Sequence, residues 1–185
     1  MVNSPGTHSM YYVAIVCPPQ VDEKVLHFKN WMKERFGCIV ALKSPAHITL
    51  VPPFWMDEAR ETELRQTLRS FKSDIDELEI SSDGFSHFGN KVLFINIIKN
   101  TALQELKNHT ENQFIQLFSD VIRKDERPFH PHITIANRDM KPGDFEIAWK
   151  HFSNINFKET FLANSISLLR LRNAEINWQV VLHNA

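Results

Sequence analysis

A repeated tetrapeptide is the feature that most restricts how this chain can fold. HITL occupies residues 47–50 and HITI occupies residues 132–135. A histidine, an aliphatic residue, a threonine and a second aliphatic residue therefore occur twice in the same order. The sequence holds only nine histidines among its 185 residues, so chance is a poor explanation for two matching copies.

Each copy of the motif lies in a run that is typical of a β-strand. Side chains two residues apart on a strand point to the same face, so His47 projects beside Thr49. His132 projects beside Thr134 in the second run for the same reason. The aliphatic residues of each motif point to the opposite face, into a core. If the two strands lie side by side, or one in each of two lobes, both polar pairs converge on one cleft.

An imidazole next to a hydroxyl, present twice, is suited to phosphoester chemistry. A neutral imidazole can take a proton from an attacking water or hydroxyl, and a protonated imidazole can give one to the leaving oxygen. Both forms coexist near neutral pH, because the ordinary pKa of histidine is ~6.5. Threonine hydroxyls can bind the non-bridging phosphate oxygens and hold the phosphorus between the imidazoles. This chemistry needs no metal ion and no cofactor.

Two kinds of apolar pattern predict the elements of the whole chain. Apolar residues at three- and four-residue steps predict helices, which we expect at residues 20–37, 57–75, 101–124 and 144–152. Short apolar runs bounded by turn residues predict strands, which we expect at residues 10–19, 46–51, 77–82, 91–98, 132–136, 155–161, 165–172 and 176–183. Short turns separate the last three strands, which favours antiparallel pairing among them. The predicted fold class is α+β, a mixed α/β pattern with helices spread between the strands.

Length and charge exclude several classes of protein. A chain of 185 residues with 43% hydrophobic residues suits one domain, or two small lobes, with a real core. No run of 18 apolar residues exists, so we expect no membrane span. With 21 Lys and Arg against 22 Asp and Glu, the chain lacks the basic surface that binding to duplex DNA requires.

The N-terminal residues and the two cysteines indicate the extent of the domain and its cellular compartment. We expect a disordered tail at residues 1–9, which lacks the features of a secretory signal, and a single bilobal domain at residues 10–185. Cys17 and Cys38 form no CxxC pair, and we interpret them as reduced thiols in the core. Reduced thiols are typical of the cytoplasm, where we expect a monomeric protein.

The pair of H-h-T-h motifs, in which h is an apolar residue, resembles the two-histidine phosphoesterase superfamily. The resemblance is to its 2′-5′ RNA ligase and cyclic phosphodiesterase branch in particular, and it covers most of the chain. YYVAIVCPP at residues 11–19 resembles the first strand of that family. FSHFGNKVLFINI at residues 85–97 resembles the segment between its two motifs, and SISLLRLRN at residues 165–173 resembles its late strand.

The resemblance implies a bilobal, pseudo-twofold fold in which antiparallel-rich sheets line a V-shaped central cleft, with helices outside. It also implies activity on 2′,3′- or 1″,2″-cyclic phosphates, or on 2′-5′-linked RNA and oligonucleotides. By motif match, the implied catalytic set is His47, Thr49, His132 and Thr134. No P-loop is present, so any ligation would be the reverse of the esterase reaction. Two departures from the family concern the substrate: the pair Asn137-Arg138 after the second motif, and Trp178 where a tyrosine is common.

Several other side chains are candidates for contact with the substrate. Phe88 is the best candidate for stacking on a base or ribose, because the HFG sequence around it resembles the cleft-lining turn of the family. His130 lies two residues before His132 and shares its face of the strand. The remaining candidates are aromatic residues near the motifs and cations that could bind phosphate: Phe54, Phe129, Lys91, Arg123, Arg127 and Arg138.

Two alternative interpretations remain open. His47, His130 and His132 could bind zinc, although neither motif carries an acidic residue or a cysteine and the threonines would then have no role. The fold could also serve as a non-catalytic module that binds a nucleotide or an RNA end. Binding alone does not need two titratable imidazoles, which favours the enzyme.

Overall fold

The computed structural model describes residues 7–71, 77–172 and 176–184. In this part of the chain, eight strands form two antiparallel sheets and four α-helices pack against them. The strands are β1 (His8–Val16), β2 (His47–Asp57), β3 (Leu78–Phe88), β4 (Val92–Ile97), β5 (His132–Ala136), β6 (Thr160–Ala163), β7 (Ile166–Leu171) and β8 (Gln179–Asn184). The helices are α1 (Pro19–Phe36), α2 (Glu61–Ser70), α3 (Thr101–Leu117) and α4 (Pro142–Phe152), with short 3-10 turns η1 (Val40–Lys43) and η2 (Glu58–Arg60).

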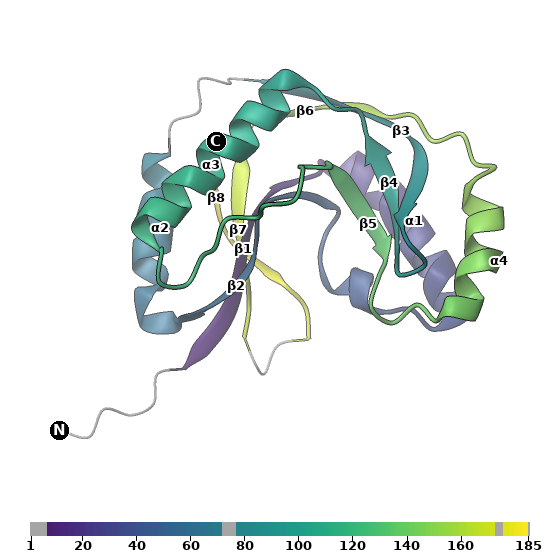
Figure 1. Ribbon diagram of the computed structural model, residues 1–185, viewed down its shortest axis with the longest axis horizontal. Coiled ribbons are helices and arrows are strands. Elements are labelled where there is room, and N and C mark those ends of the chain that lie inside the picture. The colour runs from purple at the N-terminus through teal and green to yellow at the C-terminus, as the bar shows by residue number, and fades with distance from the viewer. Residues whose placement is uncertain (1–6, 72–76, 173–175, 185) are drawn as a thin grey trace.

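The two sheets define two lobes, which face each other across the middle of the molecule (Figure 1). The first sheet has the strand order β2-β1-β7-β8, and the second has the order β5-β4-β3-β6. Helices α2 and α3 lie outside the first sheet, and α1 and α4 lie outside the second. We call these assemblies the first lobe and the second lobe. The predicted α+β, bilobal fold is confirmed.

The same strand-helix-strand unit occurs once in each half of the chain. In β1-α1-β2 and in β4-α3-β5, the first and last strands pair antiparallel. The last strand carries the repeated motif and lies at the edge of its sheet. Each helix packs across the lobe boundary, because α1 contacts β5 and α3 contacts β2. The two lobes therefore interlock, and the two motif strands contact each other where the lobes meet.

The faces of the motif strands are as the sequence predicts. The aliphatic positions of both motifs are at most 1% exposed, whereas the motif histidines and threonines are only half-buried. Burial of such an aliphatic side chain contributes about 1.5–3 kcal/mol to the free energy of unfolding. These aliphatic residues therefore anchor each strand and fix which face the polar pair presents. They are Ile48, Leu50, Ile133 and Ile135.

The local sequence explains where α1 begins and ends and where α3 begins. Pro19 occupies the first turn of α1, where its missing N–H costs nothing. Gly37 ends that helix with φ of 73° and donates its N–H to the carbonyl of Lys33 at 2.8 Å. The Asn100 side chain accepts a hydrogen bond from the N–H of Leu103 at 2.7 Å and so caps α3.

Strand β2 is longer than the strand predicted at residues 46–51. It continues through the two prolines that follow and ends at Asp57. Proline lacks an N–H, but β2 lies at a sheet edge with β1 as its neighbour, where a missing donor is tolerated. The helix predicted at residues 57–75 therefore starts later, as η2 and α2, and its residues 72–75 lie outside the described residues.

Helix α3 is shorter than the predicted helix at residues 101–124. It ends at Leu117, and the chain continues as a turn in which Ile122 donates its N–H to the carbonyl of Phe118 at 2.8 Å. Phe118 and Ile122 are nevertheless buried in the core. The apolar spacing thus continues past the end of the helix, which explains why the pattern predicted a longer one.

The predicted pairing among the last three strands is wrong for β6. That strand pairs with β3 in the second lobe, whereas β7 pairs with β1 and β8 in the first. Only two residues separate β6 from β7, so a short connection here crosses between lobes.

The ordered structure begins earlier than the predicted boundary between tail and domain, because β1 begins at His8 and the buried Ser9 hydroxyl donates to Glu58. The predicted tail at residues 1–9 therefore extends too far.

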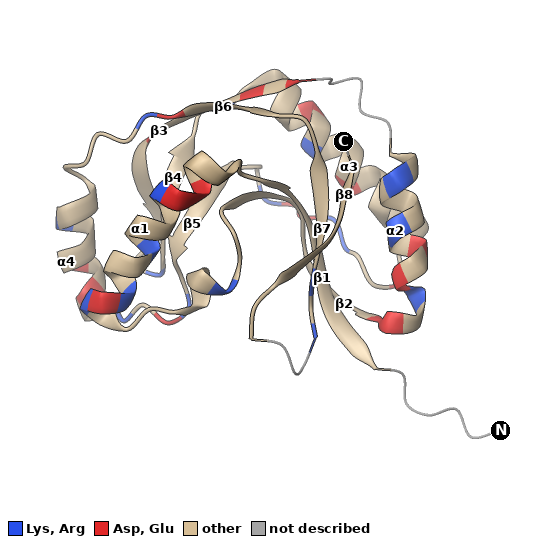
Figure 2. Cartoon of the chain, turned by 180° about the vertical axis from the view of Figure 1, so that it is seen from behind, with Lys and Arg blue, Asp and Glu red and all other residues tan. Residues whose placement is uncertain are grey.

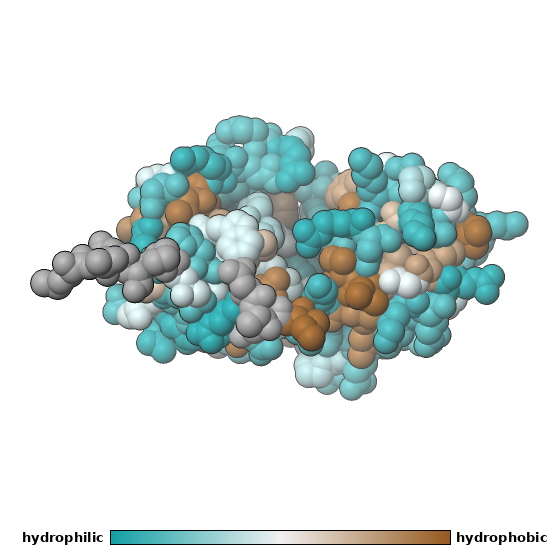
Figure 3. Space-filling model, turned by 90° about the horizontal axis from the view of Figure 1, so that it is seen from below, coloured by the Kyte–Doolittle hydropathy of each residue, from teal (hydrophilic) through white to brown (hydrophobic). Residues whose placement is uncertain are grey.

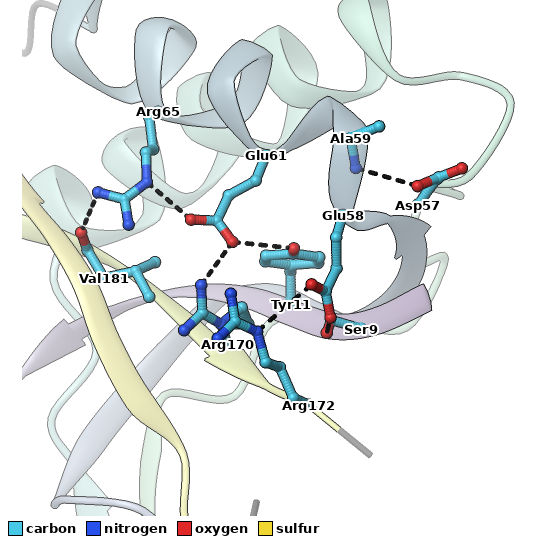
Figure 4. Close-up of polar contacts among 10 residues, drawn as sticks. All are labelled: Ser9, Tyr11, Asp57, Glu58, Ala59, Glu61, Arg65, Arg170, Arg172 and Val181. Carbon is cyan, nitrogen blue, oxygen red and sulfur yellow. Dashed lines mark hydrogen bonds and ion pairs between the residues drawn. The ribbon is translucent and has the colours of Figure 1, made fainter. Parts of the chain in front are cut away.

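A polar network ties α2 to three strands of the first lobe (Figure 4). The Glu61 carboxylate accepts hydrogen bonds from Tyr11 Oη at 3.1 Å, Arg170 Nη1 at 2.7 Å and Arg65 Nε at 2.8 Å. Arg65 also donates to the carbonyl of Val181 at 2.6 Å. The network lies on the helix side of the first sheet, so the Tyr11 hydroxyl points away from the opposite, motif-bearing face.

Charges of both signs lie mainly on the helices and loops, and along α2 the acidic residues of the first turn precede the basic ones (Figure 2). No described helix combines the length and the apolar character that crossing a bilayer needs. Cys17 and Cys38 are buried free thiols, in agreement with their predicted place in the core.

Candidate active site

The polar side chains of both motifs line two adjoining compartments between the lobes. The larger has a volume of about 600 Å³, and Thr49 and His132 lie in its wall. The smaller has a volume of about 190 Å³, and His47, Thr49 and Thr134 line it. Because Thr49 borders both, the four motif side chains converge on one cleft. The surface is hollowed between the lobes on the face that Figure 3 presents.

The two motif histidines are oriented by the same backbone device. The ring nitrogen Nδ1 of His47 lies 2.8 Å from the carbonyl oxygen of Pro45, and Nδ1 of His132 lies 2.7 Å from that of His130. A carbonyl oxygen only accepts hydrogen bonds, so each Nδ1 carries the hydrogen. In the neutral ring, Nε2 is then the atom that can accept a proton.

Aromatic rings hold each imidazole from the side. The ring of Tyr12 lies 4.9 Å from that of His47, and Trp178 packs edge-on against Tyr12 at 4.5 Å. In the second lobe, Phe94 lies 4.9 Å from His132, and Phe88 lies 5.1 Å from it. Each motif histidine therefore has an aromatic neighbour from the adjacent strand, supported by a second aromatic residue.

Burial shifts the proton affinity of both motif histidines downward. It lowers the pKa of His47 to about 4, and the positive charges of Lys29 and His132 act in the same direction, against the carbonyl of Pro45. Burial also lowers the pKa of His132. Both rings are therefore neutral near pH 7, and an anion bound between them would favour their protonated forms.

Helix α1 holds the backbone segment that precedes His47. Asp22 Oδ1 accepts a hydrogen bond from the N–H of Ala46 at 2.6 Å. Lys29 Nζ donates to the carbonyl oxygen of Ser44 at 3.0 Å. Sequence reasoning missed both residues, although Lys29 lies four residues after Val25 on the apolar face of its helix, where a charged residue is a signal of a specific partner.

Residues 17–175 match the family model described as the 2′-5′ RNA ligase superfamily. The chain belongs to this superfamily. The family predicted from the repeated H-h-T-h motif is therefore confirmed. Both motif histidines, one from each half of the chain, lie within the matched region.

Individual proteins are similar to the chain over most of its length. The RNA 2′,3′-cyclic phosphodiesterase of Bacillus subtilis (strain 168) is 26% identical over 147 residues, which cover 72% of this chain and 74% of the relative. Among solved structures, E. coli LigT complexed with 3′-AMP has a TM-score of 0.66 at 16% identity, covering 95% of this chain and 97% of LigT. TT0787 of Thermus thermophilus has a TM-score of 0.63 at 15% identity, covering 95% of this chain and 96% of TT0787. The two structures establish a shared fold.

Two of the predicted substrate contacts lie beside the superfamily motif of the second lobe. Phe88 and His130 line the larger compartment, and their rings are 5.3 Å apart. Phe88 is 42% exposed, so part of its side chain is accessible to a ligand. His130 Nε2 is buried and has no hydrogen-bond partner among the described residues. Both remain candidates.

The predicted cations are distributed unevenly around the cleft. Arg138 lines the smaller compartment. Arg127 and Phe129 line the larger one, where Arg127 forms a 2.7 Å ion pair with Asp125. Arg123 donates to the carbonyl of Ser119 and lines neither of these two compartments.

Phe54 and Lys91 do not reach the cleft. Phe54 is only 6% exposed and stacks on Tyr11, with ring centroids 6.1 Å apart, in the core of the first lobe. Lys91 is exposed in the turn between β3 and β4 and lines neither of the two compartments. We therefore remove both from the candidate contacts. Phe54 is close to the first motif in sequence, but its side chain packs in the core and does not point into the cleft.

The zinc alternative needs three ligands around one point. Within the described residues, no group of three or more His, Cys, Asp or Glu side chains is placed to hold a metal ion. His47, His130 and His132 therefore do not form the triad that the zinc alternative requires.

Proposed function

We propose that this protein is a metal-independent phosphodiesterase that opens the cyclic phosphate of a 2′,3′-cyclic nucleotide or RNA end. One observation carries the proposal. Both motif histidines are held through Nδ1 by the carbonyl two residues earlier, and they line compartments that share Thr49. The name of the Bacillus subtilis relative, RNA 2′,3′-cyclic phosphodiesterase, supports the same reaction.

The proposed reaction is one displacement at phosphorus. The oxygen of a water molecule forms a bond to phosphorus, and the bond from phosphorus to one ribose oxygen breaks. One motif imidazole takes the proton of the water at Nε2, and the other, protonated, gives a proton to the departing ribose oxygen. The hydroxyls of Thr49 and Thr134 bind the non-bridging oxygens. The product is a phosphate monoester on the ribose.

The unequal compartments suggest how such a substrate lies. A volume of about 600 Å³ is within the ordinary range for small-molecule sites, ~300–1,000 Å³. It suits a nucleoside, with Phe88 available to stack on the base. The smaller compartment is lined by polar groups and by Arg138, which suits phosphate oxygens and water.

A non-catalytic module that binds nucleotides or RNA ends is the second candidate. Its binding surface would need aromatic and cationic side chains, which the larger compartment also offers. It would not need two imidazoles whose Nδ1 atoms are fixed by carbonyl partners. This duplicated arrangement favours acid-base chemistry over binding alone.

The test is a substrate panel measured with EDTA present. The panel holds 2′,3′-cyclic AMP and UMP, ADP-ribose 1″,2″-cyclic phosphate and 2′-5′ oligoadenylate, and products are resolved by ³¹P NMR. We expect a single phosphate monoester from at least the 2′,3′-cyclic nucleotides. Tight binding without turnover of any substrate would instead establish the non-catalytic module.

A further inference from the structure

Two polar atoms that border the smaller compartment are buried without a well-formed hydrogen bond among the described residues. They are the Asn137 carbonyl oxygen Oδ1 and the Tyr12 hydroxyl, which has the Ser44 side chain nearby. Both side chains line the compartment that contains His47. Buried polar groups of native proteins are nearly always satisfied, so each unsatisfied group calls for a ligand or a water.

Packing fixes the Tyr12 hydroxyl at this place. The residue is 2% exposed, and its ring is held between the rings of His47 and Trp178. Burial raises the pKa of Tyr12, and the nearby Ser44 side chain opposes this only in part. The hydroxyl therefore keeps its hydrogen and acts as a donor over the whole range in which the histidines titrate.

The size of the compartment limits what can bind there. Its volume of about 190 Å³ is below the ~300 Å³ at which pockets for small organic ligands begin. It is sufficient for several water molecules at ~30 Å³ each. The occupant that the two orphaned groups await is therefore small and able both to donate and to accept hydrogen bonds.

We propose that Tyr12 and Asn137 bind and orient the water molecule that attacks phosphorus, with His47 as the base that removes its proton. The inference rests on the proposed function, because it assigns the nucleophile of that reaction to the smaller compartment. His132, beside the nucleoside-sized compartment, then protonates the ribose oxygen that leaves.

One water molecule can form a hydrogen bond with each of Asn137, His47 and Tyr12 and still attack phosphorus. Its two hydrogens are donated to Asn137 Oδ1 and to Nε2 of His47. One lone pair accepts from the Tyr12 hydroxyl, and the other lone pair forms the new bond to phosphorus. The proton from the water moves to His47 as the bond from phosphorus to the ribose oxygen breaks. That oxygen takes a proton from His132, so atoms and charges balance.

Methanol is a probe of this arrangement because it competes with water as a nucleophile but carries only one O–H. In the wild-type site, methanol must leave Asn137 Oδ1 without a donor, which disfavours it. The experiment measures hydrolysis and methanolysis of 2′,3′-cyclic AMP together in aqueous methanol, with the methyl ester and the monoester resolved by ³¹P NMR. The partition ratio between the two products reports on the nucleophile site alone.

The two variants have different expected results. Asn137→Ala should raise the share of methyl ester about 3- to 10-fold and lower kcat for hydrolysis. Tyr12→Phe should lower kcat about 3- to 10-fold for both nucleophiles and leave the ratio unchanged, because either oxygen can accept its hydrogen bond. These factors correspond to the loss of one hydrogen bond. KM should change little, since the substrate itself touches neither group.

Tyr11→Phe is the matched control. It removes the same hydroxyl from the neighbouring residue of β1, but that hydroxyl donates to Glu61 on the other face of the sheet (Figure 4). This variant should lower the Tm and leave kcat and the partition ratio at wild-type values. Tyr12→Phe should lower the Tm less than Tyr11→Phe, because the Tyr12 hydroxyl lies near the Ser44 side chain but makes no well-formed hydrogen bond among the described residues.

The outcomes separate this inference from the proposed function. A wild-type protein that turns over no cyclic phosphate contradicts the proposed function. A wild-type enzyme whose Asn137→Ala variant keeps the wild-type partition ratio contradicts the water-binding role alone. A rise in KM for either variant, with kcat unchanged, also contradicts it, because the pair would then bind the substrate and not the nucleophile.

Discussion

Lys29 Nζ donates a hydrogen bond to the carbonyl oxygen of Ser44 at 3.0 Å, three residues before His47. The lysine is 3% exposed and belongs to α1, which packs on the second lobe, whereas Ser44 leads into β2 of the first. The contact therefore joins the lobes at the segment that leads into one motif histidine. The positive charge of Lys29 also disfavours the protonation of His47.

Replacing that buried cation should move the pH profile of the reaction. In Lys29→Met, the loss of a positive charge raises the pKa of His47, so the acidic limb of kcat/KM should shift to higher pH. We expect kcat to fall about 2- to 10-fold, because the Ser44 carbonyl loses its donor. The control is Lys33→Met, one turn further along α1 and exposed. An acidic limb that stays in place in Lys29→Met would contradict the electrostatic role.

Acid should destabilise the fold through the same histidine. The pKa of His47 is lowered to about 4 by burial, against ~6.5 in the unfolded chain, so the unfolded state binds the proton more tightly. The contribution of neutral, buried His47 to the free energy of unfolding is fully present above pH ~6.5. It is lost as the pH falls toward the pKa of His47 in the folded state. The loss should be up to about 3 kcal/mol. Urea unfolding between pH 7 and pH 4 measures it, and His47→Gln should lose less than the wild type over this range.

The hydroxyls of the motif threonines should matter more for activity than for folding. Thr49→Val and Thr134→Val keep the shape of the side chain and remove one hydrogen bond to a charged phosphate, worth about 1.5–3 kcal/mol. Each should lower kcat/KM by at least about 10-fold at an unchanged Tm. Full activity in both variants would mean that the threonines do not touch the phosphate.

The repeated motif was sufficient to predict which residues converge. The period of two placed Ile48 and Ile133 in the core and His47 and His132 in the cleft, because a strand buried on one face leaves its register little freedom. The bilobal architecture followed from the family resemblance that the two motifs carry.

Other features depend on contacts between distant parts of the chain, which local patterns do not contain. Phe54 was expected near the substrate from its place in sequence, but it packs on Tyr11 across the sheet. The lobe crossing after β6 has no local signal, because a two-residue connection usually joins paired strands. No local pattern marks Tyr12, and the sequence marks Asn137 only as a departure from the family, because their role depends on the compartment that both side chains line.

The most direct measurement is the turnover of 2′,3′-cyclic AMP by the wild type, His47→Ala and His132→Ala, with EDTA present throughout. The account predicts full wild-type activity in the chelator, because the site holds imidazoles and hydroxyls and needs no metal. It predicts that each variant lowers kcat about 10²- to 10⁴-fold, that the double variant loses less than the product of the two, and that all three variants remain folded. Near-normal turnover in either single variant would contradict the central claim, and so would loss of wild-type activity in EDTA that zinc or manganese restores.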